Sequence, residues 1–268
     1  MLYNRTIISS IVYPDQLIAI TGDRMYPKTY LIKTDDFSEV WALSVYTTMR
    51  NGMVIPAESE PDAPLTRDIN LQIELTGPAI KQMLDAKLHP LYPQQHGVSE
   101  YRNQFNPESN DCQKSLDPEN GFDYTYYQRL CLYGDTKLDQ VEKIAINLKP
   151  FNRRLQAVTW LPAEDLCAIK STPCLRSVHI RQLSDLTYEI IFDWRSRDLY
   201  KAFQMNLAGL VYFVHTRINA ARAKLGLDPL RCVKVVDKTD FAHVYEDDWT
   251  EALRVVVLAQ TYNERVFG

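Results

Sequence analysis

Cys174 is the cysteine in the chain whose surroundings best fit chemistry. It stands in Ser171-Thr-Pro-Cys-Leu175, after a proline turn and at the start of a predicted strand. A nucleophilic cysteine needs nearby cations or hydrogen-bond donors that lower the pKa of its thiol. Most cysteines are instead small buried apolar residues, so this position alone carries little weight.

Arginines gather at two places that can bind a phosphate. Asn152-Arg153-Arg154 precedes a predicted strand, and Trp194-Arg195-Ser196-Arg197-Asp198 joins a predicted strand to a predicted long helix. At a helix N-terminus, the free backbone N–H groups, the helix dipole and a guanidinium fork all favour an anion. We therefore expect a phosphate site at Arg195 and Ser196. Pairing between surface charges is the alternative explanation.

Two further positions can hydrogen-bond a small polar ligand. Asn206 lies two turns into the same predicted helix, among apolar neighbours. Its amide offers a donor and an acceptor to the edge of a planar base, although on this position alone a local hydrogen bond between helix and strand is the preferred explanation. His243-Val-Tyr245 places two polar side chains on one side of an extended segment. This pair can grip a sugar hydroxyl, or it can form the outer face of a strand.

Alternating apolar and polar residues predict strands in the second half of the chain. We expect strands over 155–160, 177–181 and 186–194, and valines at 233, 235 and 236 predict another. One face of the 186–194 strand should carry Leu186, Tyr188, Ile190, Phe192 and Trp194.

Apolar residues three or four positions apart predict one long helix over 199–225. Asp198 is the candidate N-cap of this helix, and Gly226 follows its end. A second helix is predicted over 249–259.

The first half of the chain is less regular. Turn signals between short apolar runs predict short strands within 1–35. A helix is expected to begin after Asp35 or Asp36 and to end at Asn51-Gly52, followed by a loop over 54–66. Residues 69–75 alternate apolar and polar side chains, as a half-buried strand does.

Residues 89–121 contain several prolines and many Asn and Gln residues, so we expect the least regular structure there. Such a segment is either a lid over a site or a solvated insertion. Helices and strands intermix along the chain without a strict βαβ order. We therefore predict a single mixed α/β (α+β) domain over 1–268, with 1–35 as an N-terminal extension.

Composition excludes several classes of protein. The 268 residues carry a net charge of −4, which argues against a nucleic-acid partner. Glycine-rich nucleotide loops are missing from the sequence, and its five cysteines form no CxxC pair. Its five histidines form no HExxH motif, so we predict no metal. The apolar run at the N-terminus is short and broken by serines, and no stretch reaches the ~18 apolar residues of a membrane span. We therefore expect no membrane partner and a cytoplasmic location.

Taken in order, these segments resemble the thymidylate synthase family, including its pyrimidine-nucleotide hydroxymethylase branch. The resemblance covers about residues 122 to 249 and extends more loosely back to Phe37. Its most specific part is Arg195-Ser196-x-Asp198 with Asn206 eight residues after Asp198. The other segments that match in order are Phe122-Asp-Tyr-Thr-Tyr-Tyr-Gln-Arg-Leu130 (as in archaeal-type members), Asp139-Gln140, Asn152-Arg153-Arg154, Pro173-Cys174 and His243-Val-Tyr245. The resemblance implies the family's fold, a mixed sheet packed by helices.

In this family, a cysteine thiolate adds to carbon 6 of a pyrimidine nucleotide, and carbon 5 then attacks the one-carbon unit of methylenetetrahydrofolate. The resemblance implies that Cys174 is the nucleophile, made more acidic by Arg195 and the other phosphate-site arginines. It implies that Tyr126 joins the proton transfers around carbon 5. The family also supplies a general acid/base glutamate, which by order is Glu100, with Glu74 as the alternative.

The resemblance further implies how the nucleotide phosphate is held. Arg195 and Ser196 bind the 5′-phosphate, and Arg67 is a looser match for another phosphate ligand. Arg153 and Arg154 correspond to a pair that reaches the phosphate of the partner subunit. A homodimer is therefore expected.

The base, the sugar and the folate have their own implied ligands. Asn206 reads the base edge and favours uracil, because the cytosine-specific branch tends to carry Asp at this position. His243 and Tyr245 bind the sugar 3′-hydroxyl. Asp198 holds the folate ring and helps proton movement there.

The sequence departs from the family pattern mainly on the folate side. Leu175 follows the cysteine where His is common, Trp194 precedes Arg195 where Gln is common, and Ala202 replaces a usual glycine. These changes bear on the product. If hydride from tetrahydrofolate reaches the methylene group on carbon 5, a methyl group results, whereas a water gives hydroxymethyl.

We place methylation of dUMP to dTMP first among the expected reactions. Hydroxymethylation of dUMP, UMP, dCMP or CMP is second. A catalytically silent homologue that binds nucleotide is the alternative from a different functional class.

Overall fold

The computed structural model describes residues 27–58, 62–117, 119, 123–167 and 172–267, with the backbone alone over 259–267. The short strands expected before residue 27 lie outside the described residues. Within this part of the chain the strands are β1 (Thr29–Thr34), β2 (Met53–Pro56), β3 (Leu65–Thr76), β4 (Gln156–Val158), β5 (Leu175–Ser184), β6 (Thr187–Asp198) and β7 (Arg231–Tyr245).

Helices fill most of the remaining described chain. They are α1 (Phe37–Asn51), α2 (Pro78–Leu84), α3 (Gly97–Asn103), α4 (Asn110–Leu116), α5 (Tyr126–Cys131), α6 (Gln140–Asn147), α7 (Pro162–Asp165), α8 (Phe203–Lys224), a short 3₁₀ helix at Glu246–Asp248, and α9 (Trp249–Phe267). The predicted helix over 249–259 is confirmed and is longer than expected.

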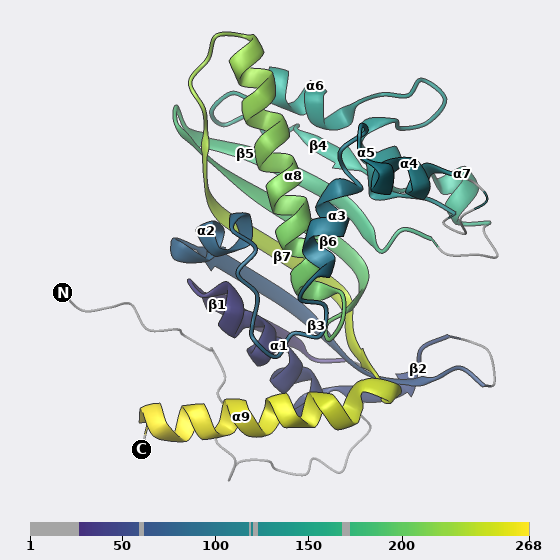
Figure 1. The fold of residues 1–268 in the computed structure, drawn as a ribbon, viewed down its shortest axis with the longest axis vertical. Coiled ribbons are helices and arrows are strands. Elements are labelled where there is room, and N and C mark those ends of the chain that lie inside the picture. Colours follow the sequence, from purple (N-terminus) through teal and green to yellow (C-terminus); the bar gives the residue numbers. More distant parts are fainter. Residues whose placement is uncertain (1–26, 59–61, 118, 120–122, 168–171, 268) are drawn as a thin grey trace.

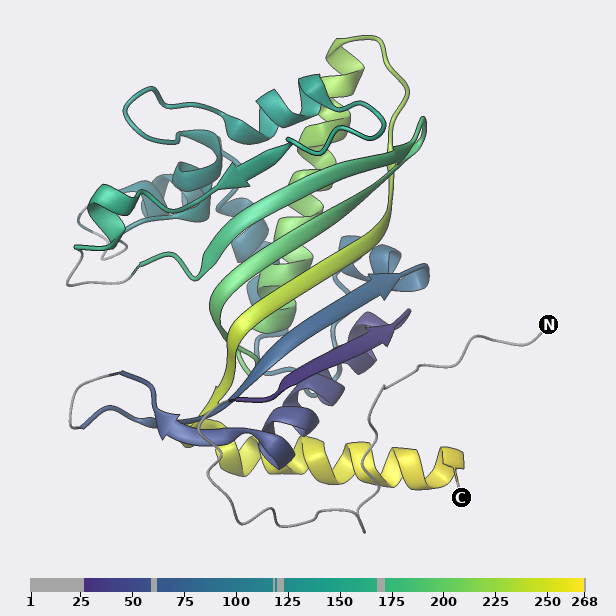
Figure 2. The same cartoon turned by 180° about the vertical axis from the view of Figure 1, so that it is seen from behind.

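All the described strands join one seven-stranded mixed sheet, with the order β1-β3-β7-β6-β5-β4 and with β2 paired to β3. The β1–β3 and β6–β7 pairs are parallel, and the other pairs are antiparallel. Helices α1, α2, α3 and α8 lie against one face of the sheet (Figure 1). From behind, the strands are visible with no described helix across them (Figure 2). The predicted mixed α/β class is confirmed.

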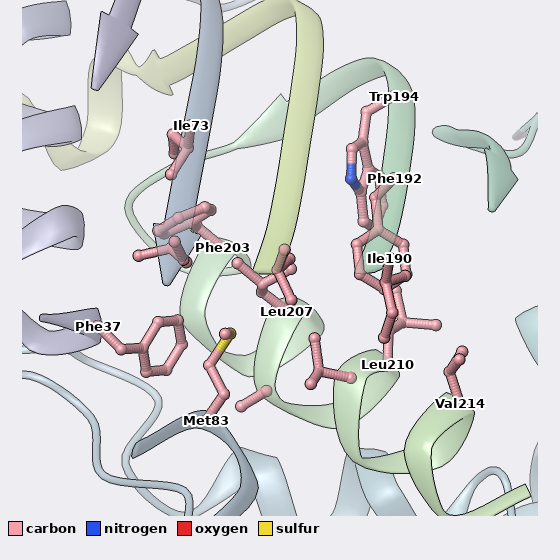
Figure 3. Close-up of a cluster of buried hydrophobic side chains, with 14 of the residues drawn as sticks. Phe37, Ile73, Met83, Ile190, Phe192, Trp194, Phe203, Leu207, Leu210 and Val214 are labelled. Atoms are coloured by element: carbon pink, nitrogen blue, oxygen red, sulfur yellow. The ribbon is translucent and has the colours of Figure 1, made fainter. Parts of the chain in front are cut away.

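The core lies between the sheet and α8. Ile190, Phe192 and Trp194 of β6 project toward α8, where Leu207 and Leu210 meet them (Figure 3). All of these side chains are buried, and burying each one stabilises the fold by about 1.5–3 kcal/mol. The predicted alternation is confirmed for the buried Tyr188 as well, whereas Leu186 precedes the strand and is exposed.

The junction between β6 and α8 differs from the prediction. β6 continues to Asp198 because its end pairs in parallel with β7, with Ser196 opposite Phe241 and Asp198 opposite His243. Helix α8 begins only at Phe203, so the expectation that Asp198 caps it is wrong. The Asp198 carboxylate instead accepts hydrogen bonds from two backbone N–H groups of the turn before the helix. Ser196 therefore lies on a strand, and the expected helix N-terminus at Arg195 and Ser196 is wrong.

Other predicted elements are close to those observed. Asp36 caps α1, and its carboxylate accepts from the N–H groups of Ser38 at 2.7 Å and Glu39 at 3.0 Å. Gly226 ends α8 with a φ of 68°, a left-handed conformation that suits glycine. The predicted loop over 54–66 contains most of β2, which pairs with β3.

Residues 89–121 are more ordered than their composition predicts. The segment contains α3 and α4, and α3 packs against α8. Val98, Tyr101, Phe105 and Cys112 are buried, so the expectation of an irregular loop throughout is wrong. Pro90, Pro93 and Pro107 fall in turns before α3 and between α3 and α4, where they hide the apolar spacing of α3. A role as a lid stays a prediction.

Candidate active site

Cys174 lies directly before β5, where the backbone of β6 fixes its position. The backbone N–H of Arg195 donates to the carbonyl oxygen of Cys174 at 2.8 Å. The Arg195 side chain donates from Nε to the Pro173 carbonyl at 3.1 Å and from Nη2 to the Thr172 carbonyl at 3.0 Å. Arg195 therefore holds the turn that carries the cysteine, as well as placing a positive charge beside it.

Burial and charge act in opposite directions on the Cys174 thiol. Burial raises the pKa of the thiol above its ordinary value, and the positive charges of Arg195 and Arg197 lower it without cancelling that effect. The charge of Arg195 thus acts in the expected direction, toward a more acidic Cys174 thiol, and burial has the larger, opposite effect. The lost hydration of the thiolate outweighs both charges.

Arg197 is a buried cation that the sequence analysis did not assign to the site. It forms an ion pair with Asp237, and its guanidinium lies 4.0 Å from the centroid of the Trp194 ring. Asp237 also accepts a hydrogen bond from the indole of Trp194 at 3.0 Å. Arg197 and Asp237 each lie just beyond a predicted strand, over 186–194 and around the valines at 233, 235 and 236, and their pairing becomes visible only when β6 and β7 are known to be neighbours.

Tyrosine side chains surround Cys174. Burial is the largest cause that raises the pKa of each phenol, and the Cys174 thiolate raises it further. The tyrosines affected in this way are Tyr101, Tyr124, Tyr126 and Tyr245. Of these, Tyr126 and Tyr245 were predicted site residues, and Tyr101 and Tyr124 were not.

Tyr126 is positioned by the start of α5. Thr125 caps this helix in a reciprocal capping box with Gln128. The Tyr126 hydroxyl accepts a hydrogen bond from the N–H of Leu175 at 3.1 Å, and its ring stands edge-on to Trp194. Burial and nearby groups raise the pKa of Tyr126 well above its ordinary value. At neutral pH it is therefore a phenol that can donate or relay a proton, not a phenolate.

A second polar group forms where the ends of β6 and β7 pair. His243 Nδ1 lies 3.4 Å from the hydroxyl of Ser196 and 3.1 Å from the carbonyl of Phe241. The imidazole stands edge-on to Tyr245, with 4.7 Å between ring centroids. Asp198 lies opposite His243 in the register. The structure thus brings four predicted site residues together: Ser196, Asp198, His243 and Tyr245.

Asp198 is mainly perturbed by burial, which raises the pKa of its carboxyl. Backbone hydrogen bonds from Lys201 and Tyr200 and the charge of His243 oppose this shift. Both backbone bonds go to Oδ1, at 3.0 Å and 2.8 Å, so Oδ2 keeps its capacity to accept from a ligand.

Asp68 belongs to the same group and was missed by the sequence analysis. It pairs with His243 across β3 and β7, and it is 4% exposed. Asp68 Oδ1 and His243 Nε2 are both buried, and neither has a hydrogen-bond partner among the described residues. Burial raises the pKa of the Asp68 carboxyl. The predicted strand was placed over 69–75, one position too late to include this residue.

Arg67 points away from this group. Neighbouring residues of a strand face opposite sides of the sheet, so Arg67 and Asp68 diverge. The Arg67 guanidinium instead lies 5.0 Å from the centroid of the Trp249 ring. The structure does not bring Arg67 beside Ser196 or His243.

Asn206 and Glu100 have different surroundings. Asn206 is half-buried near the start of α8, close enough to Tyr101 to affect the pKa of its phenol. Glu100 is exposed on α3, and successive helix residues point about 100° apart. Tyr101, not Glu100, therefore takes the inward position near Cys174. The alternative, Glu74, pairs with Lys33 at 3.3 Å and Lys234 at 3.1 Å.

Arg153 and Arg154 are exposed and lie far along the sheet from Cys174. The carbonyl of Leu155 accepts a hydrogen bond from the N–H of Ile180 in β5. At about 3.3 Å per strand residue, this pairing separates Arg154 from Cys174 by about 20 Å. The two arginines do not join the site of their own chain.

Neither a metal-binding cluster nor a membrane-spanning helix is found in the described ranges. No group of three or more His, Cys, Asp or Glu side chains there is arranged to hold a metal ion. None of the helices described is both long and apolar enough to cross a membrane.

Curated proteins from methanogenic archaea are similar in sequence to this chain. No protein-family model matches the chain. A Methanopyrus kandleri protein with the provisional name thymidylate synthase is 32% identical over 214 residues, which cover 78% of this chain and 90% of that protein. A Methanosarcina mazei protein with the same provisional name is 31% identical over 137 residues, which cover 50% of this chain and 58% of that protein. A third, from Methanothermobacter thermautotrophicus, is 30% identical over 51% of this chain and 57% of its own length. The chain therefore belongs to the thymidylate synthase family.

Proposed function

We propose that this protein transfers a one-carbon unit from methylenetetrahydrofolate to carbon 5 of a pyrimidine nucleoside monophosphate, with methylation of dUMP to dTMP as the leading reaction. The observation that carries the proposal is the grouping around Cys174. Arg195 holds the turn that carries Cys174, and buried tyrosines lie near the Cys174 thiol. Asn206 would supply the amide that binds the edge of the base. This is the set of groups that covalent addition to a pyrimidine needs.

The nucleotide would lie with its phosphate toward Arg195 and Ser196. Arg195 already uses Nε and Nη2 to hold the cysteine turn, which leaves Nη1 to donate to a phosphate oxygen. The sugar would then reach His243 and Tyr245. The buried Nε2 of His243, which has no hydrogen-bond partner in the described chain, suits a sugar hydroxyl.

Cys174 would add through sulfur to carbon 6 of the base. Its raised pKa means that the thiol is mostly protonated in the free protein. The proton must therefore leave Sγ for solvent as the carbon–sulfur bond forms, and the C5–C6 double bond of the base opens to leave its electron pair on carbon 5 and the neighbouring carbonyl. Arg195 and Arg197 stabilise the thiolate during this step because both charges favour the ionised form. Tyr126, a phenol at neutral pH, would relay protons near carbon 5.

The residues near Asp198 fit a folate ring. A pterin presents N–H donors along one edge, and the Oδ2 oxygen of Asp198 is able to accept from them. Folate supplies the one-carbon unit when bound. Asp198 would orient the ring, and the half-buried position of its carboxylate limits access of water.

A homodimer is part of the proposal. Arg153 and Arg154 are exposed and distant from Cys174 of the same chain. They can contribute to a phosphate site only if it belongs to another copy. The uncovered sheet face in Figure 2 offers a surface for such a partner, and ion pairs cross it, such as Arg181 with Glu189 at 2.5 Å.

Hydroxymethylation of a pyrimidine nucleotide is the second candidate. The tyrosine hydroxyls around Cys174 favour it, because hydroxyl groups can order a water molecule beside carbon 5. A water so placed would compete with hydride for the methylene group.

Product analysis by mass spectrometry tests the proposal. The protein is incubated with methylenetetrahydrofolate and, separately, with dUMP, UMP, dCMP and CMP. We expect a methyl gain on dUMP with formation of dihydrofolate. A hydroxymethyl gain would select the second candidate, and the nucleotide that reacts would identify base and sugar.

Two cysteine variants give the control. Cys174→Ala should abolish turnover while nucleotide binding stays measurable. Cys167→Ser changes an exposed free cysteine and should leave turnover intact. Full turnover by Cys174→Ala would refute its role as nucleophile. Nucleotide binding without any product from the wild-type protein would identify a silent homologue.

A further inference from the structure

The hydroxyl of Tyr101 is the least explained polar group near Cys174. The residue is 8% exposed, and its hydroxyl is buried without a hydrogen bond of ordinary geometry, although the Asn206 side chain lies near enough to act on the phenol as a hydrogen-bond partner. A buried hydroxyl without a partner costs free energy, so native proteins rarely retain one without a reason. A small rotation of a neighbouring polar group would satisfy it.

Close packing between α3 and α8 fixes where this hydroxyl points. A Cβ atom on Gly209 would lie 2.3 Å from Cδ1 of Tyr101, so the ring sits directly on the α8 backbone. The ring also meets Phe105 edge-on, with 5.4 Å between centroids. Phe105 in turn stacks on Phe213 at 4.5 Å. The ring is therefore held by its contacts with α8 and with Phe105.

Asn206 is the polar side chain that lies beside the Tyr101 hydroxyl. Residues three apart in a helix share a face, so Asn206 lies one turn before Gly209 on the side covered by Tyr101. Burial has the largest effect on the Tyr101 phenol, and Asn206 is among the groups close enough to act on it. The Asn206 side chain acts on the Tyr101 phenol as a hydrogen-bond partner, and it is only half-buried, which leaves part of it accessible to a ligand.

An asparagine amide can bind either pyrimidine, depending on which way it is turned. With its oxygen beside the base N3–H and its NH₂ beside the carbon 4 carbonyl, it is complementary to uracil. The reverse orientation is complementary to cytosine. An amide oxygen has two lone pairs, so it can accept from N3–H and from a tyrosine hydroxyl together. In the reverse orientation the tyrosine proton would stay buried without an acceptor.

We propose that Tyr101 is a positioning residue that donates its hydroxyl proton to Oδ1 of Asn206 and thereby sets the preference for uracil over cytosine nucleotides. The inference rests on the proposed function, because it assumes that Asn206 faces the base. Tyr101 acts through Asn206 and does not touch the substrate.

Tyr101→Phe tests the inference, because it removes one oxygen and keeps the ring that packs on Gly209. Affinities of the whole protein for dUMP, dCMP, UMP and CMP are measured by calorimetry, without folate. We expect the ratio of uracil to cytosine affinity to fall about tenfold, the effect of one hydrogen bond in a buried site.

Two controls separate positioning from a structural role. In an Asn206→Ala background, Tyr101→Phe should leave the base ratio unchanged, because the amide it orients is gone. Tyr188→Phe removes another buried tyrosine hydroxyl, which bonds Nδ1 of His215 at 2.8 Å, and should also leave the ratio unchanged.

Each remaining outcome has a clear meaning. An unchanged ratio in Tyr101→Phe, while the wild-type protein prefers uracil, overturns this inference and leaves the proposed function standing. An equal fall in the ratio with and without Asn206 also overturns it, because Tyr101 would then act by another route. A wild-type protein that binds none of the four nucleotides overturns both.

Discussion

Replacing Gly209 with alanine should destabilise the protein, although alanine is the better helix former. Helix propensity alone favours alanine by about 0.8–1.0 kcal/mol. The new Cβ would lie 2.3 Å from Cδ1 and 2.8 Å from Cε1 of Tyr101, well inside ordinary contact. Tyr101 cannot easily retreat because Phe105 also packs against its ring. Overpacking of this kind costs about 1–3 kcal/mol, and the constrained ring places the cost in the upper part of that range.

We therefore expect a net loss of about 1–2 kcal/mol in the free energy of unfolding. Urea unfolding followed by tryptophan fluorescence measures it. The decisive comparison uses a Tyr101→Ala background, which removes the ring. There, Gly209→Ala should become stabilising by about 1 kcal/mol, so the effect changes sign. Equal destabilisation in both backgrounds would show that the close contact with Tyr101 is not the cause.

Two further perturbations test the charges near Cys174. Because burial raises the pKa of the Cys174 thiol, its alkylation by iodoacetamide, followed by peptide mass spectrometry, should increase with pH through a midpoint above the ordinary value of a cysteine thiol. Arg195→Met removes a charge that lowers this pKa and should move the midpoint higher; a downward shift would contradict the argument. Asp237→Ala leaves the buried Arg197 without its ion-pair partner and should cost about 3–5 kcal/mol in urea unfolding. Adding Arg197→Met should recover part of this loss, and no recovery would refute the explanation.

Local patterns predicted the interior faces of the main elements well. The alternation in β6 and the three-to-four spacing in α8 identified side chains that are indeed buried against each other. The patterns failed at the junction between these elements. There, the backbone stays extended to Asp198 because β7 offers a parallel partner. A partner about forty residues later in the chain leaves no local signal.

The site residues were also predicted with uneven success, because contacts between segments distant in sequence leave no local pattern. Residues within one short motif, such as Ser196 and Asp198 or His243 and Tyr245, do lie together, and their roles stay predictions. Two residues that reach the site from elements outside these motifs, Asp68 of β3 and Tyr101 of α3, were missed. Tyr101 did leave a signal: Val98, Tyr101 and Phe105 are spaced as one face of a helix. The prolines around them concealed it.

The position of β7 has a consequence for synthesis of the protein. β7 lies between β3 and β6 in the sheet, yet it is the last strand in the sequence. The hairpin of β5 and β6 and the parallel pair of β1 and β3 are complete much earlier, but they have no contact through the sheet until β7 emerges.

At a translation rate of roughly 5–20 residues per second, both parts of the sheet are therefore synthesised seconds before the strand that joins them. Long-range pairings of this kind form slowly. The strand that finally joins them also carries His243 and Tyr245. A nascent chain consequently gains its continuous sheet and the last residues of its site during the synthesis of one strand.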